Sequence, residues 1–228
     1  MKAIITITSV VCLVANLAQA QNLLLNGDFN SQNVVTSSGG GENYGAAPDN
    51  WTVWTYSPGN DAWANRQVDN TSSFDGSFYM GLGSFGGAGD ASGVYQTVSG
   101  TTGLTYDLTV ESGVQNWWWP DGTMALSFLD GSGNVLGSAS VLDVTTGITS
   151  YDSGLPWRSF DVNATAPTGT VQVKVEFSAL HNSSTGGGGT VFFDNAVLTV
   201  VPEPSAMAVV AFGGIAALGW RRVFRRTN

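Results

Sequence analysis

The sequence predicts an all-β protein built as an antiparallel β-sandwich, and three observations support this fold class. Short runs rich in Val, Leu, Phe, Tyr and Trp are separated by Gly, Thr, Ser, Asn and Asp. The runs 104–110 and 171–177 alternate between apolar and polar residues, which gives each strand one buried and one solvated face. Outside the termini, no helical period continues long enough to predict an amphipathic helix.

The strands follow from these runs in chain order. We expect strands near 22–25, 51–56, 77–82, 93–98, 104–110, 123–129, 135–141, 158–162, 171–177 and 190–199. The pair Asp130-Gly131 predicts a tight hairpin turn between two of them, because Gly tolerates the backbone angles of such turns. Longer loops are expected at 31–50, 57–71, 145–155 and 179–189.

The N-terminus has the features of a secretory signal peptide, so residues 1–20 are expected to form a signal helix that is later removed. Lys2 precedes an apolar run over 3–17, and Ala18-Gln19-Ala20 fits the small-x-small cleavage rule, with Gln21 as the first mature residue. The Sec translocon and signal peptidase are then partners. Cys12 is the only cysteine, so the mature chain has no disulfide and must be stabilised by its core.

The C-terminus, 201–228, combines three features in order. Val201-Pro202-Glu203-Pro204 is followed by an apolar run over 206–220, and then by Arg221, Arg222, Arg225 and Arg226. A helix over the apolar run would be roughly 22 Å long, against a bilayer core of roughly 30 Å. Flanking arginines can extend it by snorkelling and mark the cytoplasmic side. The alternative is a buried core helix at the end of a soluble domain.

This order resembles the PEP-CTERM sorting signal, in which the Pro-Glu-Pro motif, a transmembrane helix and an Arg-rich tail are read by an exosortase. The resemblance implies an exported protein of a Gram-negative bacterium. Its precursor would be anchored in the inner membrane, and its mature form would lie at the cell surface or in the extracellular matrix. Sorted proteins of this kind accompany exopolysaccharide and biofilm production.

The body between the two signals, 21–200, is strongly acidic and long enough for one sandwich domain. It holds 16 Asp and Glu against Arg66, Arg158 and Lys174, a formal net charge of −13. Nucleic acid is therefore excluded as a partner, because phosphate binding needs a basic surface. Cations and neutral sugars suit such a surface better.

Both ends of the body carry a second resemblance. The segments 22–30, with Trp51 downstream, and 192–198 (Phe-Phe-Asp-Asn-Ala-Val-Leu) are similar to those of carbohydrate-binding modules, the jelly rolls of the galactose-binding-like class. The resemblance implies a jelly roll and a structural Ca²⁺. The matching positions are Asn30, Asp75 and Asp194, with backbone carbonyls near Gly76. Asn30 departs from the pattern, where an acid is commoner, and the alternative is that Asp75 and Asp194 cap turns.

Tryptophan supplies the candidate binding residues, because its flat ring matches the C–H face of a sugar. Three consecutive strand residues cannot all face inward, so Trp117-Trp118-Trp119 predicts an exposed aromatic platform. Arg66, Asp121 and Gln115 are its candidate polar partners. The alternative places these aromatics against the core, as we expect for Trp51.

The sequence offers little to a catalytic function. His181 is the only histidine, it lies among loop residues where we expect it to face solvent, and no hydrolase or zinc motif occurs. We therefore expect a non-catalytic domain that binds extracellular polysaccharide. The alternatives are a structural biofilm-matrix or surface protein without sugar binding, and a weak glycan hydrolase, which needs two carboxylates at a set separation.

Overall fold

We analysed a computed structural model of the chain. It describes residues 21–31, 47–56, 62–67, 74–75, 77–85, 87, 89–114, 120–145, 157–181 and 189–201, with backbone only for 62–67. The predicted signal peptide and the predicted sorting signal beyond Val201 lie outside these ranges. A search of the described ranges for a helix long and apolar enough to cross a membrane found none.

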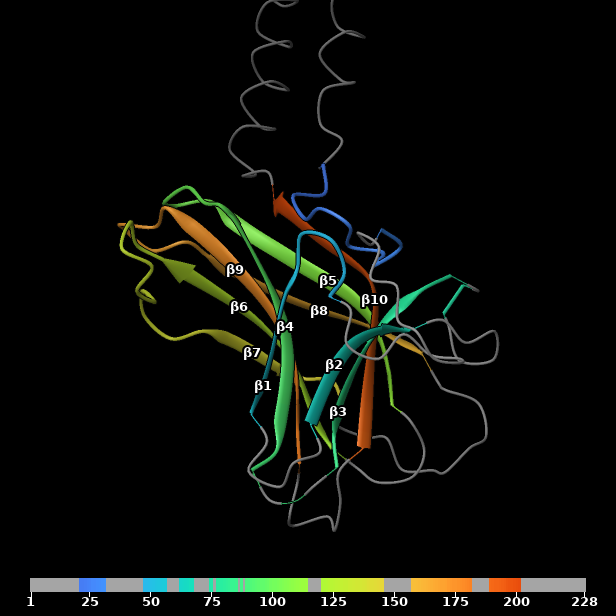
Figure 1. Cartoon of the computed structure of the whole chain (residues 1–228). Helices are drawn as coiled ribbons and strands as arrows, with labels where there is room; N and C mark the ends of the chain where they lie inside the picture. Colours follow the sequence, from blue (N-terminus) through green and yellow to red (C-terminus); the bar gives the residue numbers. More distant parts are fainter. Residues whose placement is uncertain are drawn as a thin grey trace, which may run out of the picture.

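The described chain folds into two five-stranded antiparallel sheets (Figure 1). Sheet A has the order β1-β4-β9-β6-β7, and sheet B has the order β2-β3-β10-β5-β8. The strands of sheet A are β1 (Thr52–Tyr56), β4 (Ala91–Ser99), β9 (Gln172–Leu180), β6 (Asp121–Leu129) and β7 (Ser140–Asp143). Those of sheet B are β2 (Ala62–Gln67), β3 (Tyr79–Ser84), β10 (Gly189–Val201), β5 (Thr105–Val114) and β8 (Arg158–Thr165).

This architecture confirms the predicted antiparallel β-sandwich, while its assignment as a jelly roll stays a prediction. Three strand predictions were wrong in detail. Strand β2 lies inside the predicted loop 57–71, and β7 is shorter than the predicted strand 135–141 because Val135 forms only an isolated bridge to Leu129. Residues 22–25 form no strand. The predicted Asp130 turn is present: the Asp130 carboxylate accepts hydrogen bonds from the N–H groups of Ser132 and Asn134.

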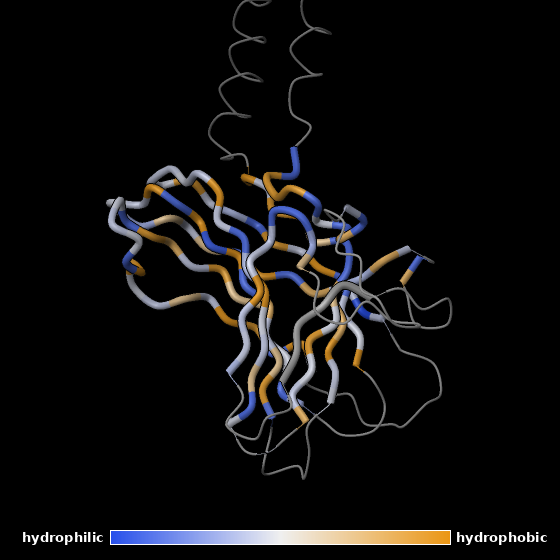
Figure 2. The backbone as a smooth tube through the Cα atoms, viewed as in Figure 1, coloured by the Kyte–Doolittle hydropathy of each residue, from blue (hydrophilic) through white to orange (hydrophobic). Residues whose placement is uncertain are grey.

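The core lies between the sheets and follows the alternation of the sequence. Tyr106, Leu108 and Val110 of β5 and Val173, Val175 and Phe177 of β9 all point into this core and are buried. Apolar and polar residues alternate along these strands in Figure 2. An aromatic series runs through the core from Phe29 to Trp51, Phe177 and Phe193, with successive ring centroids 5.1, 5.7 and 4.7 Å apart. Trp51 is therefore a core residue, as expected.

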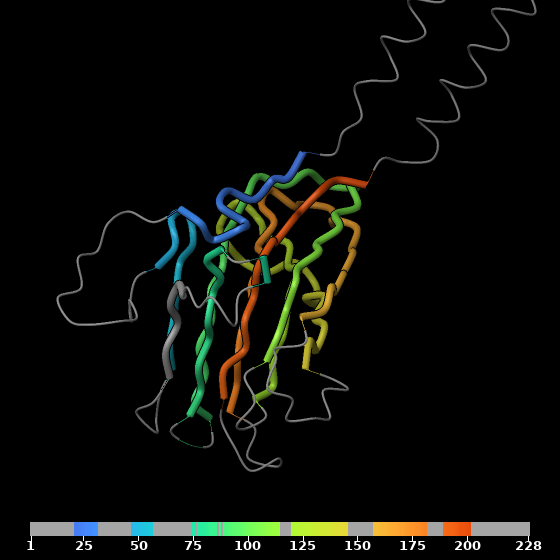
Figure 3. Tube along the Cα trace, turned by 90° about the vertical axis from the view of Figure 1, so that its right-hand side faces the viewer, coloured from blue at the N-terminus to red at the C-terminus, as the bar shows by residue number. Residues whose placement is uncertain are grey.

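The N-terminal segment is tied to the last strand by hydrogen bonds that replace a regular ladder. Leu23 N–H donates to the Leu198 carbonyl, and Ala196 N–H donates to the Gly27 carbonyl. Gly27 is required there, because a Cβ would lie 2.1 Å from the Ala196 oxygen. The start of the segment and the end of β10 thus lie side by side at one pole of the sandwich (Figure 3).

Candidate functional site

The outer face of sheet A carries a row of side chains that crosses all five of its strands. Strand register places Trp54 opposite Gly93, Gly93 opposite Ser178, Ser178 opposite Thr123, and Thr123 opposite Asp143. Val94, Phe177 and Met124, the residues adjacent to this row in their strands, point into the core. Because side chains alternate along a strand, the row itself must point outward.

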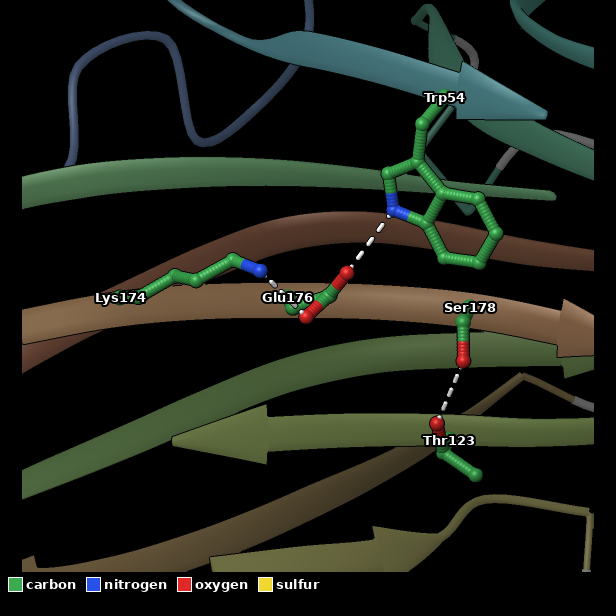
Figure 4. Close-up of polar contacts among 5 residues, drawn as sticks. All are labelled: Trp54, Thr123, Lys174, Glu176 and Ser178. Atoms are coloured by element: carbon green, nitrogen blue, oxygen red, sulfur yellow. Dashed lines mark hydrogen bonds and ion pairs between the residues drawn. The ribbon is translucent and has the colours of Figure 1, made fainter. Parts of the chain in front are cut away.

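Trp54 lies directly over Gly93 and is fixed there by a hydrogen bond. A Cβ at Gly93 would lie 2.4 to 2.5 Å from three atoms of the indole, so only glycine leaves room for the ring. The indole Nε1–H donates to Glu176 Oε1 over 2.8 Å, across two strand spacings (Figure 4). The side chain stays partly exposed. The sheet therefore holds an indole in one position with part of its surface open to solvent.

Glu176 binds both the Trp54 indole and the Lys174 ammonium. Its second carboxylate oxygen, Oε2, lies 2.8 Å from Lys174 Nζ, and both side chains are about one quarter exposed, 26% and 25%. The same ammonium lies 4.6 Å from the centroid of the Tyr95 ring, within the range of a cation–π interaction. Trp54, Glu176, Lys174 and Tyr95 thus form one connected group, which we call the Trp54 network.

Hydroxyl and apolar groups surround the Trp54 network. Thr123 Oγ1 and Ser178 Oγ share a hydrogen bond of 2.7 Å (Figure 4), and their strands, β6 and β9, lie three and two strands away from the strand of Trp54. Tyr56, Leu180 and Val141 lie on the same face, with 64, 42 and 59% of their surface exposed. An aromatic ring, exposed apolar contacts and fixed polar groups on one surface are what a sugar chain requires, since a sugar has apolar C–H faces and hydroxyl edges.

The outer face of sheet B is packed differently. Phe192 is only 2% exposed and lies beneath Tyr79 and Trp157, at ring-centroid distances of 4.9 and 6.4 Å. Trp157 also contacts Phe74, at 5.8 Å, and covers Gly113. These four aromatic residues form a second, satellite core that is closed over the sheet.

Beside this aromatic cluster, Asp194 is a buried carboxyl group with one unsatisfied oxygen. Its side chain is fully buried; Oδ1 accepts the N–H of Asn195, while Oδ2 has no hydrogen-bond partner among the described residues. Burial, with smaller contributions from the nearby carboxylates of Asp75, Asp28 and Glu111, raises the pKa of Asp194 to about 7, although the hydrogen bond from the Asn195 N–H opposes this shift. Neutral pH therefore places a poorly solvated negative charge at this point.

The residues expected to hold Ca²⁺ come together around Asp194 in part. The Asn30 side-chain oxygen accepts the N–H of Phe78, which brings it to the segment that holds Asp75. Asp75 is exposed, and hydrogen bonds from the Ser77 hydroxyl and N–H lower its pKa. The carboxylate and amide oxygens of Asp194, Asp75 and Asn30 are of the type that Ca²⁺ prefers. In the part of the chain that is described, however, no three His, Cys, Asp or Glu side chains form a metal-binding group, so a cation here must also use backbone carbonyls or water. Gly76 lies outside the described residues.

The residues predicted for the sugar platform are mostly not described. Gln115, Trp117, Trp118 and Trp119 lie outside the described ranges, in the connection from β5 to β6, and they remain a prediction. Arg66 is described only as backbone, opposite Met80 in β3. Asp121 opens β6 opposite Leu180, so it lies on the outer face of sheet A. His181 is partly buried and donates its N–H to the Asp90 carbonyl.

The Trp54 network was missed by the sequence interpretation. Lys174 and Glu176 occupy the polar positions of a strand that the sequence identifies correctly, but the residue facing them is 122 positions away in the chain. The sequence did contain one signal: Trp54 and Tyr95 each occupy a position of a predicted strand whose side chain points away from the core. Without the strand order, however, the sequence does not show that these two residues lie on the same sheet.

Comparison with known proteins identifies similar folds but no family. No family model matches the chain, and no curated protein matches it. Among solved structures, the enzymatically active domain of tailspike protein 4 of bacteriophage CBA120 is similar with a TM-score of 0.55 at 16% identity, over 79% of this chain and 21% of that chain. Our chain thus corresponds to about one fifth of the tailspike chain.

Two carbohydrate-binding modules are similar along nearly their whole length. TmCBM61, solved in complex with β-1,4-galactotriose, has a TM-score of 0.48 at 13% identity over 80% of this chain and 100% of its own. A family 16 carbohydrate-binding module has a TM-score of 0.47 at 18% identity over 78% and 99%. At such identities the similarity concerns the fold alone. The chain has a two-sheet antiparallel β-sandwich fold, similar to that of the tailspike domain.

Proposed function

We propose that the body of this protein binds extracellular polysaccharide through the outer face of sheet A. The observation that carries this proposal is the Trp54 indole, which is seated over Gly93 and held by Glu176 with part of its surface in solvent. A ring fixed in this way loses little conformational entropy when a sugar stacks on it. The Thr123–Ser178 hydroxyls and the Glu176 carboxylate lie nearby to receive the sugar's own hydroxyls.

The geometry of the row suits a chain rather than a single sugar. Trp54, Gly93, Ser178, Thr123 and Asp143 lie on five adjacent strands, and four strand spacings of about 4.8 Å span roughly 19 Å. A glycan lying across the strands would meet the indole near one end and the hydroxyl pair further along. The predicted Trp117–Trp119 platform stays a separate candidate contact for the same ligand.

The test compares Trp54→Ala with the wild type on a panel of polysaccharides. We expect Trp54→Ala to weaken binding at least about tenfold, roughly 1.4 kcal/mol, and to lower the melting temperature less than Trp51→Ala does, because the Trp54 side chain is partly exposed. Trp51→Ala is the matched control, since a buried Trp should cost roughly 3 to 5 kcal/mol of stability. No binding by the folded wild type would favour the structural matrix protein, and release of reducing sugar would favour the hydrolase.

The protein is exported and sorted by an exosortase, with a precursor held in the inner membrane and a mature form at the surface or in the matrix. The support for this part of the proposal is the order of Pro202-Glu203-Pro204, apolar run and arginines in the sequence. Replacing the three residues by alanine should leave an unprocessed, membrane-bound precursor on immunoblots. A normally shortened product from that variant would contradict exosortase recognition.

A structural Ca²⁺ bound by Asp194, Asp75 and Asn30 completes the proposal. Its support is the buried Asp194 Oδ2, which lacks a hydrogen-bond partner among the described residues. A cation coordinated by this oxygen would offset the cost of burying its charge. Calcium should raise the melting temperature of the wild type at pH 8 and leave that of Asp194→Asn unchanged. An equal response of both proteins, or of neither, would remove the calcium site from the proposal.

A further inference from the structure

Among the described strands of sheet A there is one cationic side chain, and its charge is paired with a carboxylate. The five strands of sheet A contain Lys174 as their only Lys or Arg, together with the acids Glu176, Asp121 and Asp143. Lys174 Nζ is paired with Glu176 Oε2 at 2.8 Å, and the side chains of this pair are three quarters buried. The formal charge of these strands is −2.

Glu176 cannot release Lys174 without disturbing the indole. One carboxylate oxygen accepts the Trp54 Nε1–H and the other accepts the Lys174 ammonium, both over 2.8 Å. A rotation of the carboxylate toward a ligand would break one of these hydrogen bonds, and hydrogen bonds that involve a charged group are stronger than those between neutral groups. The ammonium is further held over the Tyr95 ring. The pair is thus fixed from three sides.

Along the five described strands of sheet A, a glycan with carboxylate, sulfate or phosphate groups would find no cation that is not already paired. Its charges would lose hydration beside Glu176 and gain no ion pair in return. Binding of an acidic glycan is therefore disfavoured relative to that of a neutral one. A neutral glycan incurs no such cost, because its hydroxyls can donate to Glu176 or accept from Lys174 while the pair stays intact.

We propose that the Lys174–Glu176 ion pair makes the outer face of sheet A selective for uncharged glycans over acidic ones. The inference rests on the proposed glycan-binding function and names the chemical class of the ligand. In this arrangement Glu176 is a specificity-determining residue as well as the anchor of Trp54. Because Glu176 neutralises the Lys174 ammonium, Lys174 cannot form an ion pair with an acidic ligand.

The test uses purified full-length protein and pairs of polymers that differ only in charge. Neutral β-1,4-glucan, β-1,4-galactan and β-1,4-mannan are each compared with their C6-oxidised, uronate-bearing forms by affinity electrophoresis and calorimetry. The key variant is Glu176→Gln, because a glutamine oxygen still accepts the Trp54 Nε1–H while the negative charge that neutralises Lys174 is gone.

We expect the wild type to bind at least one neutral polymer and to bind its oxidised form at least about tenfold more weakly. In Glu176→Gln, binding of the oxidised polymer relative to its neutral form should rise by at least about tenfold. That gain should disappear in about 1 M salt, where the Debye length is roughly 3 Å. It should also disappear in the double variant Lys174→Gln/Glu176→Gln.

A matched control separates local from overall charge. Asp161→Asn on β8 of sheet B removes the same unit of negative charge from an exposed position of the other sheet, and it should leave selectivity unchanged. An equal gain in Asp161→Asn, or no gain in Glu176→Gln, would overturn the inference. If the wild type bound an oxidised polymer as tightly as its neutral form and through Trp54, the inference would be overturned and the proposed function would stand. Absence of binding to any polymer by every variant would instead overturn the proposed function.

Discussion

The two outer faces of the sandwich each place a tryptophan over a glycine, yet they differ in what surrounds the indole. On sheet A, Trp54 covers Gly93 and is bonded to Glu176, beside a lysine and a pair of hydroxyls. On sheet B, Trp157 covers Gly113 and packs on Tyr79, Phe192 and Phe74. The same residue type thus forms part of a polar surface on one face and of a closed aromatic cluster on the other.

The acidic residues of the two faces differ in the same way. Both oxygens of Glu176 have partners, a Trp N–H and a Lys ammonium, and its side chain keeps some exposure. Asp194 is fully buried, and its Oδ2 has no partner in the described part of the chain. Polar groups that are satisfied and still accessible can serve a ligand, whereas a buried unsatisfied carboxylate indicates a proton or a cation at that point. This contrast is why the sugar proposal belongs to sheet A and the calcium proposal to sheet B.

The largest effect expected from this comparison is on stability. Phe192→Ala should lower the free energy of unfolding by about 3 to 5 kcal/mol, because it opens a cavity beneath Tyr79 and Trp157. Tyr56→Ala on sheet A is the control, and its cost should stay below about 0.5 kcal/mol because the side chain is exposed. Denaturant unfolding of both variants measures the difference. Equal costs would show that the two faces are packed alike.

The next effect is a pH dependence of stability that originates from Asp194. The pKa of about 7 in the folded protein exceeds the ordinary value of 3.8, so the folded state binds more protons between these two pH values. In chelator, the free energy of unfolding should therefore fall as the pH rises from about 4 to about 7, and then level off. Asp194→Asn, which does not titrate, should remove this fall and be more stable at pH 8, by up to about 4 kcal/mol.

Asp130 provides a control of opposite sign for that measurement. Hydrogen bonds from Asn134 and Ser132 lower the pKa of this exposed turn carboxylate, so its stabilising effect is lost as the pH falls through its folded pKa. Asp130→Asn should therefore reduce stability at neutral pH. A gain of stability in Asp130→Asn like that of Asp194→Asn would point to general charge repulsion rather than to burial of Asp194.

The sequence was sufficient to predict the β-sandwich because the alternation of apolar and polar residues in a strand can be recognised from neighbouring residues alone. Alternation at 104–110 and 171–177 correctly identified most of the buried side chains of β5 and β9, because the side chains of a strand point alternately to its two faces. Val171 is the exception: it precedes β9 and is 51% exposed. The segment Ala62–Gln67 was missed as β2 because Asn, Arg and Gln make up half of it. Residues 22–25 resemble a strand in sequence, yet Gln96 and Asn22 side chains bond their backbone instead.

The Trp54 network is a non-local property, and this is why it was not predicted. Its members come from β1, β4 and β9, and only the strand order brings them onto one face. Near Asp194, the resemblance of both ends to a known class named Asn30, Asp75 and Asp194 as a calcium site, and that assignment stays a prediction. The additional carboxylates of Asp28 and Glu111 became visible only through the fold.

The smallest expected effect compares the two glycines beneath the indoles. A Cβ at Gly93 would lie 2.4 Å from the Trp54 ring, whereas a Cβ at Gly113 would lie 3.4 Å from the Trp157 ring, only slightly tighter than ordinary contact. Gly93→Ala should therefore displace the Trp54 indole from Glu176 and weaken binding of a neutral glycan about five- to tenfold, roughly 1 kcal/mol. Gly113→Ala should leave that affinity unchanged. Calorimetric titration of both variants distinguishes them, and equal affinities would mean that the seat over Gly93 does not orient the indole for binding.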